Sequence, residues 1–241
     1  MPQRVMLGML TPSSNTALEP ITQAMVSSLP EVSVHFSRFK VTEIALSKNA
    51  LAQFDDSEIL RAAELLAHAK VNAIGWNGTS SGWLGFDSDL RLCERIKAAT
   101  GIPATTSMLA LNEILAKTGV SRLGFVTPYL DDVQARILEN YAKNGVACQG
   151  ERHLCLQDNF SFSEVTAAQL EAMTEEVAKE KPQAITVICT NLRAAPLVEK
   201  LERLTGLPIY DTIATVVWKS LLIANVDPQR VSGWGSLFKS K

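Results

Sequence analysis

The chain has 241 residues, of which 46% are hydrophobic, and it carries a net charge of −2. This length allows one large α/β domain or two lobes of about 120 residues. The small net charge without a basic stripe argues against nucleic-acid binding. No apolar run reaches the roughly 18 residues that span a bilayer, and the N-terminus lacks a signal-peptide pattern, so we expect a cytoplasmic protein without a membrane segment.

Apolar runs alternate with amphipathic stretches through the first half of the chain, which predicts strands and helices in alternation. We expect strands at 5–10, 32–39, 71–76 and just after Pro103, and helices at 16–28, 57–70, 87–100 and 107–117. Residues 40–56 are polar and are interpreted as a long, partly helical excursion. Asn15 or Thr16 is expected to cap the first helix, and Gly119 to end the last one.

The same pattern restarts in the second half. Strands are expected at 122–127, 146–155, 183–188 and just after Pro208, and helices at 131–144, 164–180, from 197 onwards, and at 211–224. Three anchors recur in the same order: a Thr-Pro pair after the first strand, a small-residue turn after the third, and Thr-Gly-x-Pro before the fourth. Such recurrence indicates an internal duplication.

Strands that alternate with helices imply parallel sheets covered on both faces. We therefore predict an α/β fold of two pseudo-twofold related lobes. Each lobe is a four-stranded parallel sheet flanked by helices, and the active site lies in the cleft between them. The first lobe is placed at 1–118 and the second at 119–225, with the tail at 226–241 packing back on the first. A monomer and a homo-oligomer both fit this organisation.

Ligands of parallel α/β sheets bind beyond the carboxyl ends of the strands. The residues expected there are mostly neutral hydrogen-bond donors, namely Ser14, Asn15, Gly78, Thr79, Ser80, Tyr129, Thr190 and Asn191. Such donors suit a carboxylate or an enediolate. Each Ser, Thr or Asn is also an ordinary helix cap. Because four separate strand ends carry them, we favour a site for a small dicarboxylate.

Cys189 ends the third strand of the second half, where helix N–H groups favour a lowered thiol pKa. The corresponding residue of the first half is Gly78. An inert buried thiol is the alternative for Cys189, and small buried residues are what we predict for Cys93, Cys148 and Cys155. Neither a disulfide framework nor a metal site is indicated by the cysteine and histidine spacing.

No phosphate-binding glycine motif is present, so we expect no cofactor. Asp131 and Asp132 follow Tyr129 at a predicted helix start, where acidic residues favour the helix dipole without a metal. Trp76, Trp83 and Leu84 flank the glycine turn. They are either core residues or an apolar side of the cleft, and an apolar pocket beside a carboxylate favours loss of carbon dioxide.

Five segments resemble the aspartate/glutamate racemase superfamily, and specifically its branch of arylmalonate decarboxylase and maleate cis-trans isomerase. They are Thr11–Thr16, Asn77–Ser80, Tyr129–Val133, Cys189–Arg193 and Gly233–Phe238. The resemblance implies two cysteines, one from each lobe, in racemases and isomerases. With Gly78 in the first lobe and Cys189 in the second, this chain is similar to the decarboxylase arrangement.

By that resemblance, Thr79, Ser80, Tyr129 and N–H groups near Thr190 hold one carboxylate, and Cys189 protonates the enediolate left after decarboxylation. The expected activity is a cofactor-independent carboxy-lyase acting on a malonate-type acid. The loops at Asn15 and Asn191 look more like the maleate isomerase side, where they contact substrate carboxylates. A maleate isomerase-like or racemase-like enzyme, and an inactive dicarboxylate binder, are therefore kept as alternatives.

Overall fold

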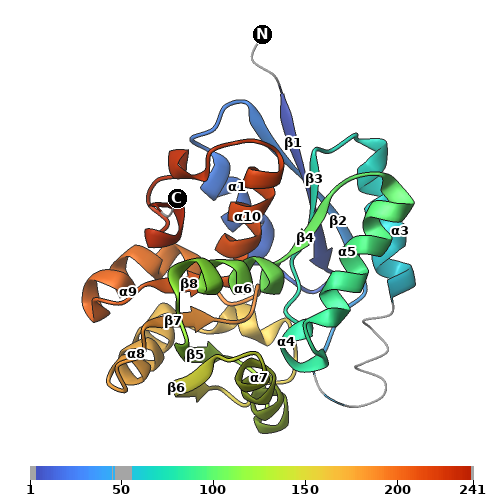
Figure 1. Cartoon of the computed structure of the whole chain (residues 1–241). Coiled ribbons are helices and arrows are strands. Elements are labelled where there is room, and N and C mark those ends of the chain that lie inside the picture. The colour runs from blue at the N-terminus through green and yellow to red at the C-terminus, as the bar shows by residue number, and fades with distance from the viewer. Residues whose placement is uncertain (1–3, 45, 47–55, 240–241) are drawn as a thin grey trace.

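The computed structural model describes residues 4–44, 46 and 56–239 and shows two parallel sheets with helices packed on them (Figure 1). The expected excursion at 40–56 falls largely outside the described residues. The first half forms β1 (Val5–Pro12), α1 (Leu18–Val26), β2 (Val32–Phe39), α3 (Asp56–His68), β3 (Ala73–Trp76), α4 (Ser81–Leu84), α5 (Asp87–Thr100), β4 (Ala104–Thr106) and α6 (Ser107–Thr118).

The second half repeats this succession. It forms β5 (Arg122–Thr127), α7 (Asp131–Lys143), β6 (Ala147–His153), α8 (Ala167–Ala178), β7 (Ala184–Val187), α9 (Val198–Thr205), β8 (Ile209–Asp211) and α10 (Thr212–Ile223), with short 3-10 turns η1 (Ser161–Glu164), η2 (Ala195–Leu197), η3 (Pro228–Arg230) and η4 (Ser236–Lys239). The expected helix at 164–180 begins only at Ala167, because Thr166 and Gln169 form a capping box there.

The two sheets have the same strand order, β2-β1-β3-β4 and β6-β5-β7-β8, and every strand pair within them is parallel. This confirms the predicted fold class of two four-stranded parallel sheets flanked by helices. The repeated Thr-Gly-x-Pro anchor has a structural reason in both halves. Gly101 and Gly206 end α5 and α9 with φ of 72° and 71°, a left-handed conformation that glycine adopts without steric cost.

The halves are packed together by α10, which lies against α6 and also against β3 of the other sheet (Figure 1). Side chains of α10 reach the backbone of β3 closely, since a Cβ on Gly75 would lie 2.9 Å from the Val216 side chain. The C-terminal segment contacts both halves: Arg230 pairs with Glu31, while Ser236 binds Glu202. Among the described residues, no helix is long and apolar enough to cross a membrane.

Candidate active site

A small cavity of about 20 Å³ lies where the carboxyl ends of β1, β3, β5 and β7 meet. Six of the residues expected at the site line it: Gly78, Thr79, Ser80, Tyr129, Cys189 and Thr190. The rest of the lining is mostly apolar and consists of Pro12, Val41, Ile44, Trp76 and Trp83, with Asn77 and Asn159. The lining therefore combines two kinds of surface: the hydroxyl groups and the thiol, called the polar wall below, and the hydrocarbon and indole surface.

The polar wall is organised by a bond between the two halves. The hydroxyl groups of Thr79 and Tyr129 lie 2.7 Å apart, and both residues are buried. The N–H groups of Thr79, Ser80 and Thr190 meet no backbone acceptor within the described part of the chain. Hydroxyl and N–H donors that converge on one wall are suited to binding a carboxylate oxygen.

Cys189 is buried, with 3% of its surface exposed, and its sulfur accepts a hydrogen bond from the N–H of Asn191 at 3.4 Å. Burial raises the pKa of this thiol to about 12, although the N–H of Asn191 and the hydroxyl of Tyr129 act in the opposite direction. The expectation of a lowered pKa is therefore wrong. The turn N–H groups are present, but no cation among the described residues faces the sulfur to offset the lost hydration.

Three expected site residues do not line the cavity but connect the halves around it. Asn15 donates from Nδ2 to the carbonyl of Thr190 at 3.0 Å, and its Oδ1 accepts from the N–H groups of Ala17 and Leu18, as a cap of α1. Asn191 accepts the N–H of Thr16 at 2.9 Å. These amides hold the strand ends of opposite halves in a fixed relation.

Ser14, the third of these residues, lies between two loops. Its hydroxyl donates to the carbonyl of Val41 at 2.6 Å and accepts from Nδ2 of Asn159 at 2.7 Å. Asn159 also accepts from Asn191 through its backbone carbonyl, and it lines the cavity. Nothing in the sequence distinguishes Asn159 from its polar neighbours, because it precedes η1 in a loop rather than following a strand.

Asp211 is a further buried group that the sequence pattern presents only as the start of a helix. Its Oδ1 caps α10 by accepting the N–H groups of Ile213 and Ala214, and its buried Oδ2 has no hydrogen-bond partner among the described residues. Burial raises the pKa of Asp211 to about 7. Its charge contributes to the raised pKa of Cys189, so the two groups are electrostatically coupled.

Gly78, which occupies the position of Cys189 in the first half, is required by the indole ring beside it. A Cβ on Gly78 would lie 1.9 Å from Cζ2 and 2.1 Å from Cε2 of Trp76. Trp76 is 1% exposed and packs on Phe39, with ring centroids 5.0 Å apart. Gly78 is not among the glycines with a positive φ, so the ring rather than the backbone conformation excludes a side chain there. The first half therefore presents an indole where the second presents a thiol.

Trp83 and Leu84 were each expected either in the core or on an apolar side of the cleft. Trp83 lines the cavity, whereas Leu84 is exposed and does not line it. Cys148 and Cys155 are exposed, so their assignment as buried residues is wrong: both belong to β6 or the loop after it, and β6 is an edge strand. A larger hollow of about 300 Å³ beside α6 and α7 contains none of the expected site residues.

Comparison with known proteins gives a consistent result. The family described as arylmalonate decarboxylase matches residues 7–238. Maleate isomerase of Pseudomonas putida is 26% identical over 98% of both chains, and arylmalonate decarboxylase of Bordetella bronchiseptica is 27% identical over 67% of this chain and 68% of its own.

Solved structures share the fold at lower identity. A cysteine-to-alanine variant of maleate isomerase from Pseudomonas putida S16 with maleate is 22% identical, with a TM-score of 0.90 and coverage of 99% of this chain and 98% of its own. A cysteine-to-serine variant of the Nocardia farcinica isomerase holds a covalently bound succinylcysteine intermediate; it is 22% identical with a TM-score of 0.88, covering 98% of this chain and 99% of its own.

Proposed function

Since the chain belongs to the arylmalonate decarboxylase family, whose relatives include maleate isomerases, we propose that it is a cofactor-independent decarboxylase of a small malonate-type acid. The observation that carries this proposal is the one-sided cavity. Cys189 provides the single sulfur among the described residues that line it, and the corresponding position of the first half, Gly78, is filled by the Trp76 ring.

Binding follows from the two walls of the cavity. Thr79, Ser80, Tyr129 and the N–H of Thr190 hold one carboxylate of the substrate. The second carboxylate then faces Val41, Ile44 and the indoles, where its charge is poorly solvated. Loss of neutral carbon dioxide relieves that unfavourable position. The space left between the lining residues is only about 20 Å³, so a substrate with small substituents requires the least movement of these side chains.

The reaction balances without a cofactor. The bond from the α-carbon to the carboxyl group on the apolar side breaks, carbon dioxide leaves, and the electron pair enters an enediolate on the remaining carboxyl group. The donors of the polar wall stabilise the enediolate charge. Cys189 then transfers its S–H proton to the α-carbon, and the thiolate recovers a proton from water. A thiol with a pKa of about 12 carries this proton at neutral pH and so is suited to the donor role.

A second candidate is cis-trans isomerisation of a small dicarboxylate, favoured by the nearly full-length similarity to maleate isomerase. The succinylcysteine in a relative that lacks one cysteine implies that another cysteine bonds to the substrate there. Such chemistry uses a thiolate nucleophile. The raised pKa of Cys189 and the missing sulfur at Gly78 favour decarboxylation instead.

The test is to incubate the protein with malonic acids bearing small α-substituents and measure carbon dioxide release, with conversion of maleate to fumarate measured in parallel. We expect decarboxylation without isomerisation. Cys189→Ala should lower turnover at least ~100-fold, the usual contribution of a general acid. The matched control is Cys148→Ser, an exposed thiol on β6, which should retain wild-type turnover.

Three results would contradict the proposal. Undiminished carbon dioxide release by Cys189→Ala would show that Cys189 is not the proton donor. Fumarate formation without decarboxylation would establish the isomerase. Stabilisation of the wild-type protein by malonates in thermal unfolding, with neither reaction, would identify an inactive binder.

A further inference from the structure

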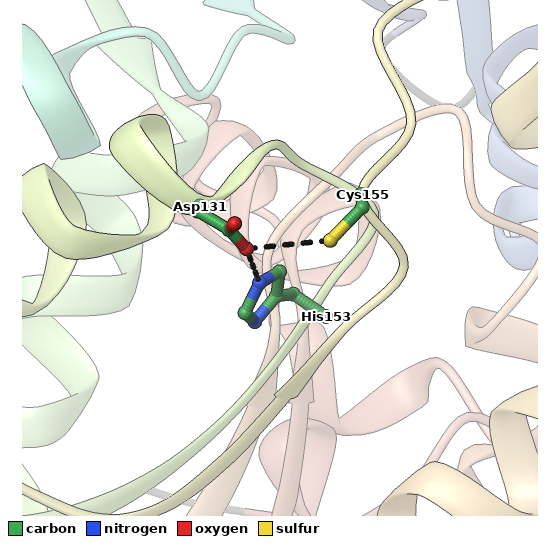
Figure 2. A group of neighbouring side chains, drawn as sticks. All are labelled: Asp131, His153 and Cys155. Atoms are coloured by element: carbon green, nitrogen blue, oxygen red, sulfur yellow. Dashed lines mark hydrogen bonds and ion pairs between the residues drawn. The ribbon is translucent and has the colours of Figure 1, made fainter.

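Three potential metal ligands meet at the carboxyl edge of the second sheet, outside the cavity (Figure 2). Asp131 begins α7, His153 ends β6 and Cys155 follows two residues later. Nε2 of His153 lies 2.7 Å from Oδ1 of Asp131, and Sγ of Cys155 lies 3.3 Å from the same oxygen. One ligand atom of each residue falls within 4.8 Å of the others. Spacing along the chain predicts no such site, because α7 separates Asp131 from the other two.

A relay of hydrogen bonds that leads into the protein interior fixes the orientation of the imidazole. Nδ1 of His153 lies 2.8 Å from Oε2 of Glu151, which also accepts from Nε2 of Gln134 at 2.9 Å. Gln134 in turn accepts the hydroxyl of Thr127 at 2.7 Å, and both of these residues are buried. Histidines that bind metals are oriented in this way, with the second ring nitrogen held by a carboxylate. Nε2 is therefore directed towards Asp131 and Cys155, as Figure 2 shows.

The backbone presents the thiol in an uncommon conformation. Cys155 has φ of 54°, in the left-handed region that few non-glycine residues adopt. It is held there by hydrogen bonds on both sides: its own N–H donates to the carbonyl of Tyr129 at 3.2 Å, and the N–H of Leu156 donates to Pro128 at 2.8 Å. Strained backbone that neighbouring contacts enforce is a recurrent feature of functional sites.

We propose that Asp131, His153 and Cys155 form a site for Zn²⁺, with the fourth position open to water or a small ligand. Sulfur, imidazole nitrogen and carboxylate oxygen are the three ligand types that zinc takes in proteins, whereas Mg²⁺ and Ca²⁺ prefer oxygen alone. Bonds of ~2.0–2.3 Å place tetrahedral ligand atoms about 3.3–3.8 Å apart. The exposed Asp131 side chain needs only a small outward movement from 2.7 Å to reach that spacing.

The site would act on the backbone next to the cavity. A bound ion ties the start of α7 to the loop after β6, and that loop is already bonded to the carbonyl of Tyr129. Tyr129 contributes its hydroxyl to the polar wall. Zinc binding should therefore raise the melting temperature of the protein, because a ligand that binds the folded state stabilises it.

The experiment uses the full chain without a histidine tag, treated with a chelator and then titrated with zinc chloride in a calorimeter. We expect one ion per chain. His153→Ala and Cys155→Ser should each weaken zinc binding at least tenfold. Cys148→Ser changes an exposed thiol on β6 and should bind zinc as the wild type does. Glu151→Gln should weaken binding by about 10- to 100-fold, the usual effect of losing a carboxylate that orients a ligand.

Cobalt(II) gives a second readout, because a bound thiolate produces an intense charge-transfer absorption band. That band should appear with the wild type and with Cys148→Ser, and should be absent with Cys155→Ser. Circular dichroism establishes that each variant is folded. Absence of 1:1 zinc binding by the folded wild type, or equal binding by wild type, His153→Ala and Cys155→Ser, would show that these residues form a hydrogen-bonded surface cluster only.

Discussion

The indole of Trp76 makes the glycine at position 78 obligatory, and this can be tested by filling the position. Gly78→Ala adds one methyl group whose carbon would lie 1.9 Å from Cζ2 of Trp76. Forcing a methyl group into a packed interior costs about 1–3 kcal/mol. For a protein of this size, each kcal/mol lowers the melting temperature by roughly 2–4 °C, so we expect a decrease of roughly 2–12 °C.

A double-mutant cycle separates the ring from other causes. In a Trp76→Leu background the three clashing ring atoms are absent, so Gly78→Ala should cost less there than in the wild type. The difference is a coupling energy of about 0.5–3 kcal/mol. Gly82→Ala, in the neighbouring helix α4, is the matched control. Its Cβ would lie 3.3 Å from the flexible end of Met108, so that side chain needs to move only slightly.

The assay is urea unfolding followed by circular dichroism, which does not depend on the tryptophan that is removed. Wild-type stability of Gly78→Ala, or an equal cost in both backgrounds, would refute the idea that the ring excludes a side chain. In the Trp76→Leu background, Gly78→Cys would then introduce the second sulfur that the wild-type cavity lacks. That variant should gain racemisation of chiral carboxylic-acid products, which requires a base on one face of the α-carbon and an acid on the other.

Two further variants address buried polar groups. Burial raises the pKa of Asp211 to about 7, against 3.8 for the free group. Between these two pH values the folded protein holds a proton that the unfolded chain releases. The stability that this proton contributes is complete below pH 3.8 and is lost as the pH rises towards 7. The expected slope is about 1.4 kcal/mol per pH unit, and Asp211→Asn, which can still cap α10, should lose that slope in urea unfolding measured between pH 5 and 7. Asn15→Ala removes a cap and leaves the carbonyl of Thr190 without its partner, so it should cost roughly 2–4 kcal/mol, whereas the exposed Asn144→Ala should cost little. A pH slope that survives in Asp211→Asn, or equal stability of the two asparagine variants, would contradict these assignments.

Much of the fold follows from the sequence because the duplication gives each element twice. The expected helix at 87–100 is α5 with the same bounds, and every expected strand in the described residues is present. Parallel strands end at one edge of a sheet, so residues that follow them were expected to lie together. That rule brings Thr79, Tyr129 and Cys189 to one cavity, and it requires no knowledge of the contacts between their side chains.

What the sequence pattern missed depends on contacts between distant segments. The pKa of Cys189 is set by how completely surrounding groups exclude water, and motif spacing carries no information about that. Asn159 reaches the cavity from a loop, and Trp76 excludes a side chain through the placement of its ring. The cluster of Asp131, His153 and Cys155 likewise forms only when α7 and β6 are packed together.

The placement of one thiol on one wall also has a consequence for the handedness of the product. In the proposed reaction, a planar enediolate held by the hydroxyl groups of Thr79 and Tyr129 would present one face to Cys189 and the other to the part of the lining formed by Trp76. Only the first face meets a proton donor. A substrate with two different α-substituents should therefore yield a single enantiomer, and in heavy water its new stereocentre should carry one deuterium.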